Sequence, residues 1–206
     1  ADGRYSFVGT PVQQTANVTN ATLGSHVYSY DESQSYDPND GLDRWVAMSG
    51  ELVPGVGYTQ ALQQEITFEG VPNVGDVSVM GTYTGTYDDA TNEETEGWVF
   101  VSNPYATAID VADFLAPNTN IEGAVYIWDD NGSDNGRGTN SDYIIANGTV
   151  ATNTTNAGGH TQYNSNLGSA QGFFVKLADD SDTEVSFTPH MRVTGSNSDD
   201  NFFRTA

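Results

Sequence analysis

Short runs of alternating or apolar residues recur along the chain, separated by clusters of Gly, Asn, Asp and Pro. Each run has the length of a strand and is rich in β-branched or aromatic residues, which favour extended backbone. Only Asp110–Ala116 has the pattern of a helix, and it is short. The expected strands are Tyr5–Gly9, His26–Tyr30, Arg44–Ser49, Tyr58–Leu62, Glu65–Glu69, Val77–Tyr83, Trp98–Ser102, Ala124–Trp128, Tyr143–Ala146, Gly172–Leu177 and Glu184–Thr188.

Four blocks of the first half recur in the same order in the second half, which indicates an internal repeat. The pairs are FVGTPV (7–12) with FVSNPY (100–105), VYSYDE (27–32) with VYIWDD (125–130), LVPGVGYTQAL (52–62) with LGSAQGFFVKL (167–177), and EITFEG (65–70) with EVSFTP (184–189). We therefore predict an all-β fold with little helix, built from two pseudo-repeated, jelly-roll-like β-sandwich units that are either separate or fused into one body.

The boundary between the two units is expected near the acidic stretch YDDATNEETEG. Its composition is typical of a linker or a long loop. The division is then 1–86 for the first unit, 87–97 for the linker, and 98–206 for the second unit, which carries an enlarged acidic loop. The repeated sequence blocks recur because the whole structural unit recurs. Such repetition indicates a structural role for these blocks more than an active site.

Charge narrows the range of partners. The chain has 28 acidic and 6 basic residues, for a formal net charge of −22. Such a surface repels phosphate backbones and anionic lipids, which argues against nucleic acid as a partner and against membrane insertion. It attracts cations, although a solvated surface without specific ion sites explains the charge equally well. There is no cysteine, so the chain has neither a disulfide nor a thiolate metal site.

Few residues suggest catalysis. His26, His160 and His190 lack the spacing of a metal triad, and the sequence has no nucleophile elbow, phosphate-binding loop or zinc-protease helix motif. Any two of the acidic residues could meet as a glycosidase pair, but nothing in the sequence selects two of them. We therefore expect a protein that is not an enzyme.

Acidic loops follow the same strand in both copies. Carboxylates and amides at alternating positions around a glycine turn provide several of the six to eight oxygens that Ca²⁺ takes, so these loops are candidate calcium sites. Asx-rich turns without an ion are the alternative, since neither loop matches the complete EF-hand pattern. The candidate ligands are Asp37, Asn39, Asp40 and Asp43 in the first copy and Asp129, Asp130, Asn131 and Asp134 in the second.

Aromatic residues are candidates for a binding platform. Flat ring faces beside hydrogen-bonding groups are what a carbohydrate site needs. The rings that could form such a platform are Tyr28, Tyr30, Trp45, Trp98, Tyr126, Trp128 and Tyr143. Of these, we select Tyr30, Trp45, Trp128 and Tyr143 as candidate ligand-binding residues. The alternative is that tryptophans in strands, such as Trp98 and Trp128, pack in the core.

The second copy resembles a module of secreted and surface proteins of Bacteroidota that are exported by type IX secretion. The resemblance lies in WVFVSNPYATAID (98–110), VYIWDD, QGFFVK (171–176), SFTPHMR (186–192) and NFFR (201–204), and PGVGY (54–58) resembles the segment that precedes this module. This chain has Ser102 where the module usually has Gly, Ala170 where it often has Pro, and a longer acidic loop after Trp128. The resemblance implies a non-catalytic β-sandwich region of a large exported protein, and it carries over no catalytic residue.

From these observations we expect an extracellular or cell-surface module that acts in adhesion or structural display, with Ca²⁺ as a hypothetical cofactor. Its partner would be a glycan, a surface protein or another copy of itself. Two alternatives stay open: a carbohydrate-binding module of a polysaccharide-degrading enzyme, and a subunit that assembles into a fibre or surface layer through its terminal strands. Because the type IX signal is not visible, we expect an internal portion of a longer protein.

Overall fold

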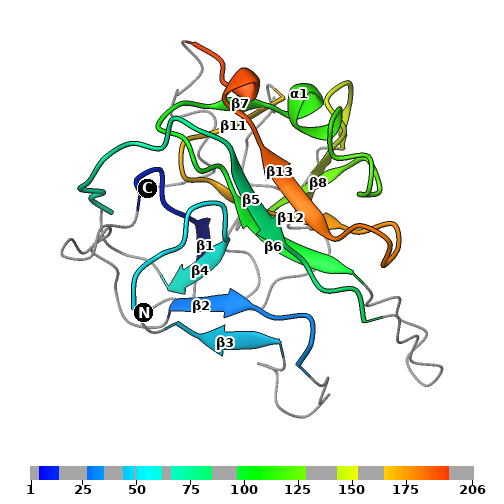
Figure 1. The fold of residues 1–206 in the computed structure, drawn as a ribbon, viewed down its shortest axis with the longest axis horizontal. Helices are drawn as coiled ribbons and strands as arrows, with labels where there is room; N and C mark the ends of the chain where they lie inside the picture. The colour runs from blue at the N-terminus through cyan, green and yellow to red at the C-terminus, as the bar shows by residue number, and fades with distance from the viewer. Residues whose placement is uncertain are drawn as a thin grey trace.

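The computed structural model describes residues 5–13, 27–34, 44–48, 50–61, 66–84, 97–128, 143–152 and 165–194. The first half forms a four-stranded antiparallel sheet in the order β1-β4-β2-β3. Figure 1 shows this sheet at the lower left of the molecule. Its strands are β1 (Tyr5–Val8), β2 (Val27–Tyr30), β3 (Trp45–Ala47) and β4 (Tyr58–Ala61).

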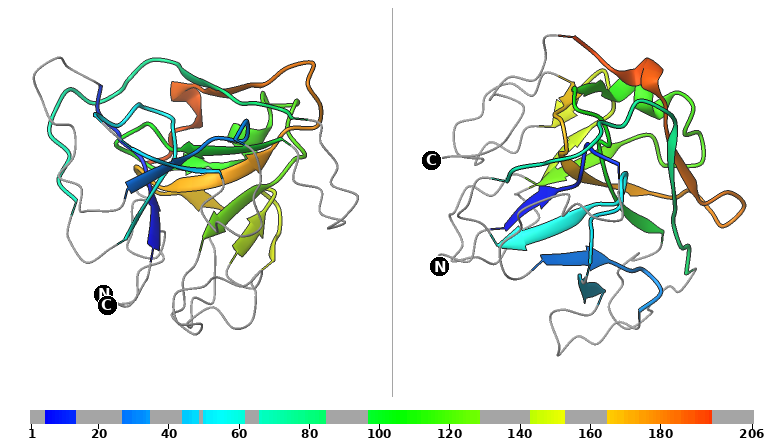
Figure 2. Two further views of the ribbon diagram at one scale, coloured as in Figure 1. Left: turned by 90° about the horizontal axis from the view of Figure 1, so that it is seen from below. Right: turned by 60° about the vertical axis from the view of Figure 1, so that its left-hand side comes forward.

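The second half forms a five-stranded antiparallel sheet in the order β10-β9-β8-β12-β6. Both views in Figure 2 show it lying against the strands of the first half. Its strands are β6 (Trp98–Ser102), β8 (Val125–Trp128), β9 (Tyr143–Ala146), β10 (Ala151–Thr152) and β12 (Gly172–Lys176).

Smaller elements cover one face of the five-stranded sheet. β5 (Val77–Met80) pairs with β13 (Glu184–Phe187), and β7 (Ile109–Asp110) pairs with β11 (Asn166–Leu167). The helix α1 (Val111–Leu115) follows β7, and its N-cap Asp110 accepts a hydrogen bond from the backbone N–H of Asp113. A 3₁₀ turn, η2 (Pro189–Met191), lies beside α1 at the top of Figure 1.

The strand pairing confirms the all-β fold and the pseudo-repeat. The first sheet and the core of the second have the same strand order, with β1, β4, β2 and β3 corresponding to β6, β12, β8 and β9. The residue register is also the same in every corresponding pair. Phe7–Thr59 corresponds to Phe100–Phe174, Tyr28–Thr59 to Tyr126–Phe174, and Tyr30–Trp45 to Trp128–Tyr143.

The two copies contact each other through equivalent residues. Val8 bridges to Gln171, and Val56, the equivalent of Gln171, bridges to Val101, the equivalent of Val8. The N–H of Gly9 donates to the carbonyl of Ala170, and the N–H of Ser102 donates to the carbonyl of Gly55, each at 2.8 Å. The two units therefore meet around an approximate two-fold axis.

This contact accommodates a side chain in only one of the two copies. Ser102 is the equivalent of Gly9, and a Cβ atom placed on Gly9 would overlap the Ser102 side chain. The Ser102 hydroxyl instead donates to the Val56 carbonyl at 2.8 Å. Because the first copy has no side chain here, the second can carry one.

The larger core lies between the five-stranded sheet and its covering elements. Alternate residues of β12, such as Phe173 and Val175, point into this core, as a pleated strand requires. Phe114 from α1 and Phe187 from β13 pack there, with ring centroids 5.1 Å apart. The first half adds β5 to this cover, so the core of the second unit contains residues from both halves.

The core of the first unit is much smaller. Its buried members are Val27, Leu52 and Tyr58, with partly buried neighbours that include Ile66 and Phe68. The prediction of a strand at Glu65–Glu69 is wrong, since residues 66–69 have no strand pairing. The alternation of apolar and polar residues at 65–69 arises because Ile66 and Phe68 pack on this small core. The strand that pairs with β13 is β5.

We predict that Gly57→Ala destabilises the protein at the contact between the two copies. A Cβ atom at this position would lie 2.5 Å from Cδ2 of Phe100, so the ring would have to move. Overpacking of this kind costs about 1–3 kcal/mol of unfolding free energy, which denaturant unfolding measures.

The matched control is Gly75→Ala, because a Cβ atom there meets nothing within 4 Å and its backbone is not left-handed. We expect no loss of stability in that variant. Equal stability of the two variants would contradict the close packing of the copies.

Candidate functional site

The second face of the five-stranded sheet carries a cluster of aromatic side chains. Residues that alternate along the strands with the core residues point to this second face. They include Trp98, Phe100, Tyr126, Trp128 and Phe174. Phe7 from β1 packs against them, with its ring centroid 4.6 Å from Phe100 and 5.6 Å from Phe174. An aromatic layer therefore joins the two sheets.

Part of this layer is open and forms a cavity of about 370 Å³ between the two sheets. One wall comes from the first unit and the other from the second. The lining residues are Tyr30, Trp45, Trp98, Tyr126, Tyr143, Ile145 and Phe174.

The rings around the cavity meet at steep angles. Tyr30 and Phe174 lie at 89° to each other with centroids 5.1 Å apart, and Trp98 and Phe174 lie at 89° with centroids 6.2 Å apart. Trp98 also meets Tyr126 at 79°, at 4.8 Å. Edge-to-face contacts are the preferred packing of aromatic rings. They turn neighbouring ring planes nearly perpendicular, so the walls are formed by both faces and edges.

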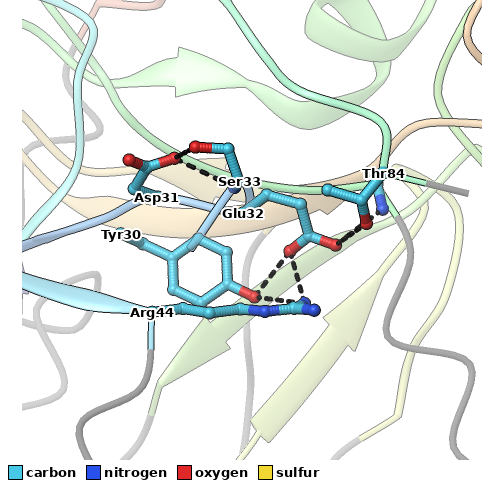
Figure 3. Close-up of polar contacts among 7 residues, drawn as sticks. Tyr30, Asp31, Glu32, Ser33, Arg44 and Thr84 are labelled. Carbon is cyan, nitrogen blue, oxygen red and sulfur yellow. Dashed lines mark hydrogen bonds and ion pairs between the residues drawn. The ribbon is translucent and has the colours of Figure 1, made fainter. Parts of the chain in front are cut away.

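A buried polar network holds the first wall in place (Figure 3). Glu32 Oε2 lies 2.8 Å from Nη1 of Arg44 and accepts a hydrogen bond of 2.7 Å from the hydroxyl of Tyr30. The other carboxylate oxygen accepts from the N–H of Gly97 at 3.1 Å and from the hydroxyl of Thr84 at 3.4 Å. Thr84 and Gly97 flank the acidic stretch between the two units, so Glu32 anchors both of its ends.

Burial sets the ionisation of this network. It raises the pKa of Tyr30 far above its ordinary value. The phenol therefore stays protonated, and its hydroxyl donates a hydrogen bond to Glu32. Burial also raises the pKa of Glu32, although hydrogen bonding from Tyr30 and the charge of Arg44 oppose that rise. Glu32 is only 3% exposed, and its four donors compensate for the water it has lost.

A second ion pair lies on the cavity side of β12. Lys176 follows Phe174 on the same face of the strand and is paired in register with Trp98. Its Nζ lies 3.3 Å from Oε1 of Glu122. Burial and the charge of Glu122 raise the pKa of Tyr126, and the charge of Lys176 lowers it. The lysine charge next to the cavity is therefore balanced by a carboxylate.

The structure brings the four predicted aromatic residues together as two equivalent pairs. Tyr30 lies opposite Trp45 across β2 and β3, and Trp128 lies opposite Tyr143 across β8 and β9. Three of them line the cavity, whereas Trp128 packs beside it against Phe7 at 5.8 Å and Tyr143 at 5.1 Å. The Nε1 of Trp128 is buried and has no hydrogen-bond partner in the described part of the chain.

Sequence reasoning missed two of the lining residues, Phe174 and Ile145. For Trp98 it left open whether the ring belongs to the platform or packs in the core. Strand alternation decides between these two positions. Val99 and Val101 point into the core, so Trp98 lies on the opposite face of the sheet.

The Asn-Pro-Tyr turn of the second copy, at 103–105, is architectural. The side-chain amide of Asn103 donates to the carbonyls of Thr107, Leu167 and Gly168, and its oxygen accepts from the N–H of Tyr105. The hydroxyl of Tyr105 donates to the carbonyl of Gly75, and burial raises its pKa to about 12. These bonds tie β6 to the turn before β12 and to the loop before β5.

The predicted calcium ligands lie outside the described residues: Asp37, Asn39, Asp40, Asp43, Asp129, Asp130, Asn131 and Asp134. Two of the three histidines, His26 and His160, also lie outside them, and His190 is exposed on η2. Within the described ranges no three His, Cys, Asp or Glu side chains gather as a metal site would require. The helices in the same ranges include none with the length and apolar character of a membrane span.

The fold and the cavity define an all-β protein in which two pseudo-repeated sheets enclose a cavity lined by aromatic rings. One family model matches residues 2–206, and its description is a domain of unknown function, DUF8693. The chain belongs to this family. No curated protein and no solved structure matches it.

We predict strong coupling between Glu32 and Arg44 in a double-mutant cycle. Glu32→Gln or Arg44→Met alone leaves one buried partner without its counter-charge, which costs about 3–5 kcal/mol of unfolding free energy. The double variant loses less than the sum of the two, because neither charge is left unpaired.

Denaturant unfolding at neutral pH measures all four stabilities of this cycle. Tyr30→Phe serves as a control that removes one donor from Glu32 and costs about 1 kcal/mol. If the losses of the two single variants simply add, Glu32 and Arg44 do not depend on each other.

Proposed function

We propose that this chain is a non-catalytic binding module of an extracellular bacterial protein and acts in adhesion or structural display. The aromatic cavity supports this proposal, because it is a concave, mostly apolar site bounded by two rigid sheets. In this account the cavity receives a chemical group from the partner surface, and the polar network around Glu32 keeps its first wall in position.

The position of the cavity suits such a role. Tyr30 and Trp45 are the last and first residues of β2 and β3, and Tyr143 is the first residue of β9. The acidic loops that were predicted from the sequence connect these strands, so the chain enters and leaves each loop next to the cavity. Binding surfaces are commonly formed where loops leave a rigid scaffold.

A carbohydrate-binding module is the second candidate, because tryptophan and tyrosine rings are suited to stacking on sugar rings. The lining residues supply hydroxyl and indole N–H groups, but no carboxylate, amide or guanidinium group is among those described. Sugar recognition depends on such directional partners. The cavity therefore favours a ligand that is held by ring faces.

We predict that Trp45→Ala and Trp98→Ala abolish adhesion. Each removes a ring from a different wall of the cavity, and buried aromatic anchors carry much of the binding energy at interfaces. The measurement is retention of the protein on intact bacterial cells and on immobilised polysaccharides.

The control for that experiment is Phe114→Leu, which alters the core on the opposite face of the sheet and leaves the cavity lining unchanged. It should lower stability and preserve adhesion. Adhesion that survives both tryptophan substitutions would show that the partner binds elsewhere.

We further predict that Ca²⁺ raises the thermal unfolding midpoint by several degrees relative to chelator at fixed ionic strength. An ion that binds only the folded state stabilises it according to its saturation. The ligands would be the carboxylates of the two acidic loops, which include Asp37 and Asp129. Mg²⁺ is the control, and an equal effect of both ions would reduce the proposal to nonspecific screening.

A further inference from the structure

We propose that the aromatic cavity binds an alkylated ammonium cation, such as a trimethylammonium group. This inference rests on the proposed function, because it specifies the chemistry of the ligand at the same site. The occupant is a cation whose charge is covered by methyl groups. It is attracted to ring faces and needs no hydrogen-bond acceptor.

The first argument is the ring geometry. The face of an aromatic ring carries negative potential and its edge carries positive potential. Trp45 stands at 81° to Phe174 and at 74° to Tyr30, and Trp98 stands at 89° to Phe174. Rings set nearly perpendicular to one another can present faces to one ligand from more than one direction, and tryptophan and tyrosine are the rings that attract a cation most strongly.

The second argument is electrostatic. The chain has a formal net charge of −22, so the long-range field around the cavity draws cations toward it. The strand ends that carry Tyr30 and Trp128 continue directly into acidic sequence, with Asp31 and Glu32 after one and Asp129 and Asp130 after the other. An anionic ligand would be repelled by the same field.

The third argument concerns the cations of the chain itself. Over the described residues, the contact of a basic side chain with a ring face is that of Arg192 with Tyr105, at 5.5 Å, and neither residue lines the cavity. Lys176, beside the cavity, is paired with Glu122. Arg192 and Lys176 thus each have a partner of their own, Tyr105 and Glu122 respectively.

The size and polarity of the cavity fit a small organic cation. Its volume of about 370 Å³ is near the lower end of the range of about 300–1,000 Å³ for small-molecule sites. The hydroxyl of Tyr30 already donates to Glu32, which reduces what the cavity can offer to a sugar hydroxyl. A ligand that needs ring faces more than hydrogen bonds matches this lining.

The test compares choline and tetramethylammonium with 3,3-dimethylbutan-1-ol, the neutral isostere of choline, by calorimetric or NMR titration of the intact chain. We expect choline to bind about tenfold more tightly than the isostere, since the two differ in charge and hardly in shape. Choline binding should weaken as ionic strength rises, and binding of the neutral isostere should not.

Fluorinated tryptophan provides a test that leaves the fold intact. In a Trp128→Phe background the remaining tryptophans, Trp45 and Trp98, both line the cavity. Fluorine withdraws electron density from the ring face, so choline affinity should fall stepwise with each added fluorine. The affinity of the neutral isostere should stay constant. A flat response of choline affinity would overturn the proposal.

The outcomes separate this inference from the proposed function. Equal affinity for choline and its isostere would overturn the cation inference and leave an apolar binding site. No binding of either compound, with adhesion still lost in Trp45→Ala, would overturn the cation inference alone. Adhesion that is unchanged in Trp45→Ala and Trp98→Ala, without choline binding, would overturn both.

Discussion

The packing of Phe7 against the aromatic face of the second sheet is the contact on which the rest of the structure depends. Phe7 belongs to a strand of the first unit, yet its ring contacts four rings of the second. These are Phe100 at 4.6 Å, Phe174 at 5.6 Å, Trp128 at 5.8 Å and Tyr143 at 6.4 Å. Among the described residues, the first unit has a core cluster of only three buried side chains, so this layer adds apolar burial to its four strands.

Divergence between the two copies gives the cavity its shape. Phe174 and Thr59 are equivalent residues, and only the second copy has an aromatic ring at this position. Phe174 stacks on Phe100 at 4.5 Å and forms part of the cavity wall. Tyr30 belongs to both the cavity and the Glu32 network, so hydrogen bonds connect the cavity wall to Gly97, directly before the second unit. The same aromatic layer thus holds the units together and lines the cavity.

Much of the fold could be predicted from the sequence because strand alternation and turn residues are local signals. The helix at Asp110–Ala116 and the repeated blocks were recognised for this reason, and the shared register of the two sheets confirms the repeat. The pairing of β5 with β13 was not predicted, since it joins residues more than half the chain apart. A two-residue pairing such as that of β7 and β11 leaves almost no periodicity to detect.

The candidate site was predicted only in part, for a physical reason. Tyr30, Trp45, Trp98 and Tyr126 are among the rings that the sequence suggests for a platform, whereas Phe174 lies within an apolar run that looks like core. Which face of a strand is core depends on the sheet packed against it, and one chain segment does not contain that information. The Glu32–Arg44 pair could not be predicted, because twelve positions separate the two residues and only the pairing of β2 with β3 brings them together.

Scanning calorimetry of the intact chain, with and without tetramethylammonium, tests the central claim most directly. If the aromatic layer joins both units and forms the binding site, the protein unfolds in a single transition whose calorimetric and van't Hoff enthalpies agree. The ligand then shifts that transition as a whole. Two separable transitions, only one of which responds to the ligand, would contradict the account, because the units would then fold and bind independently.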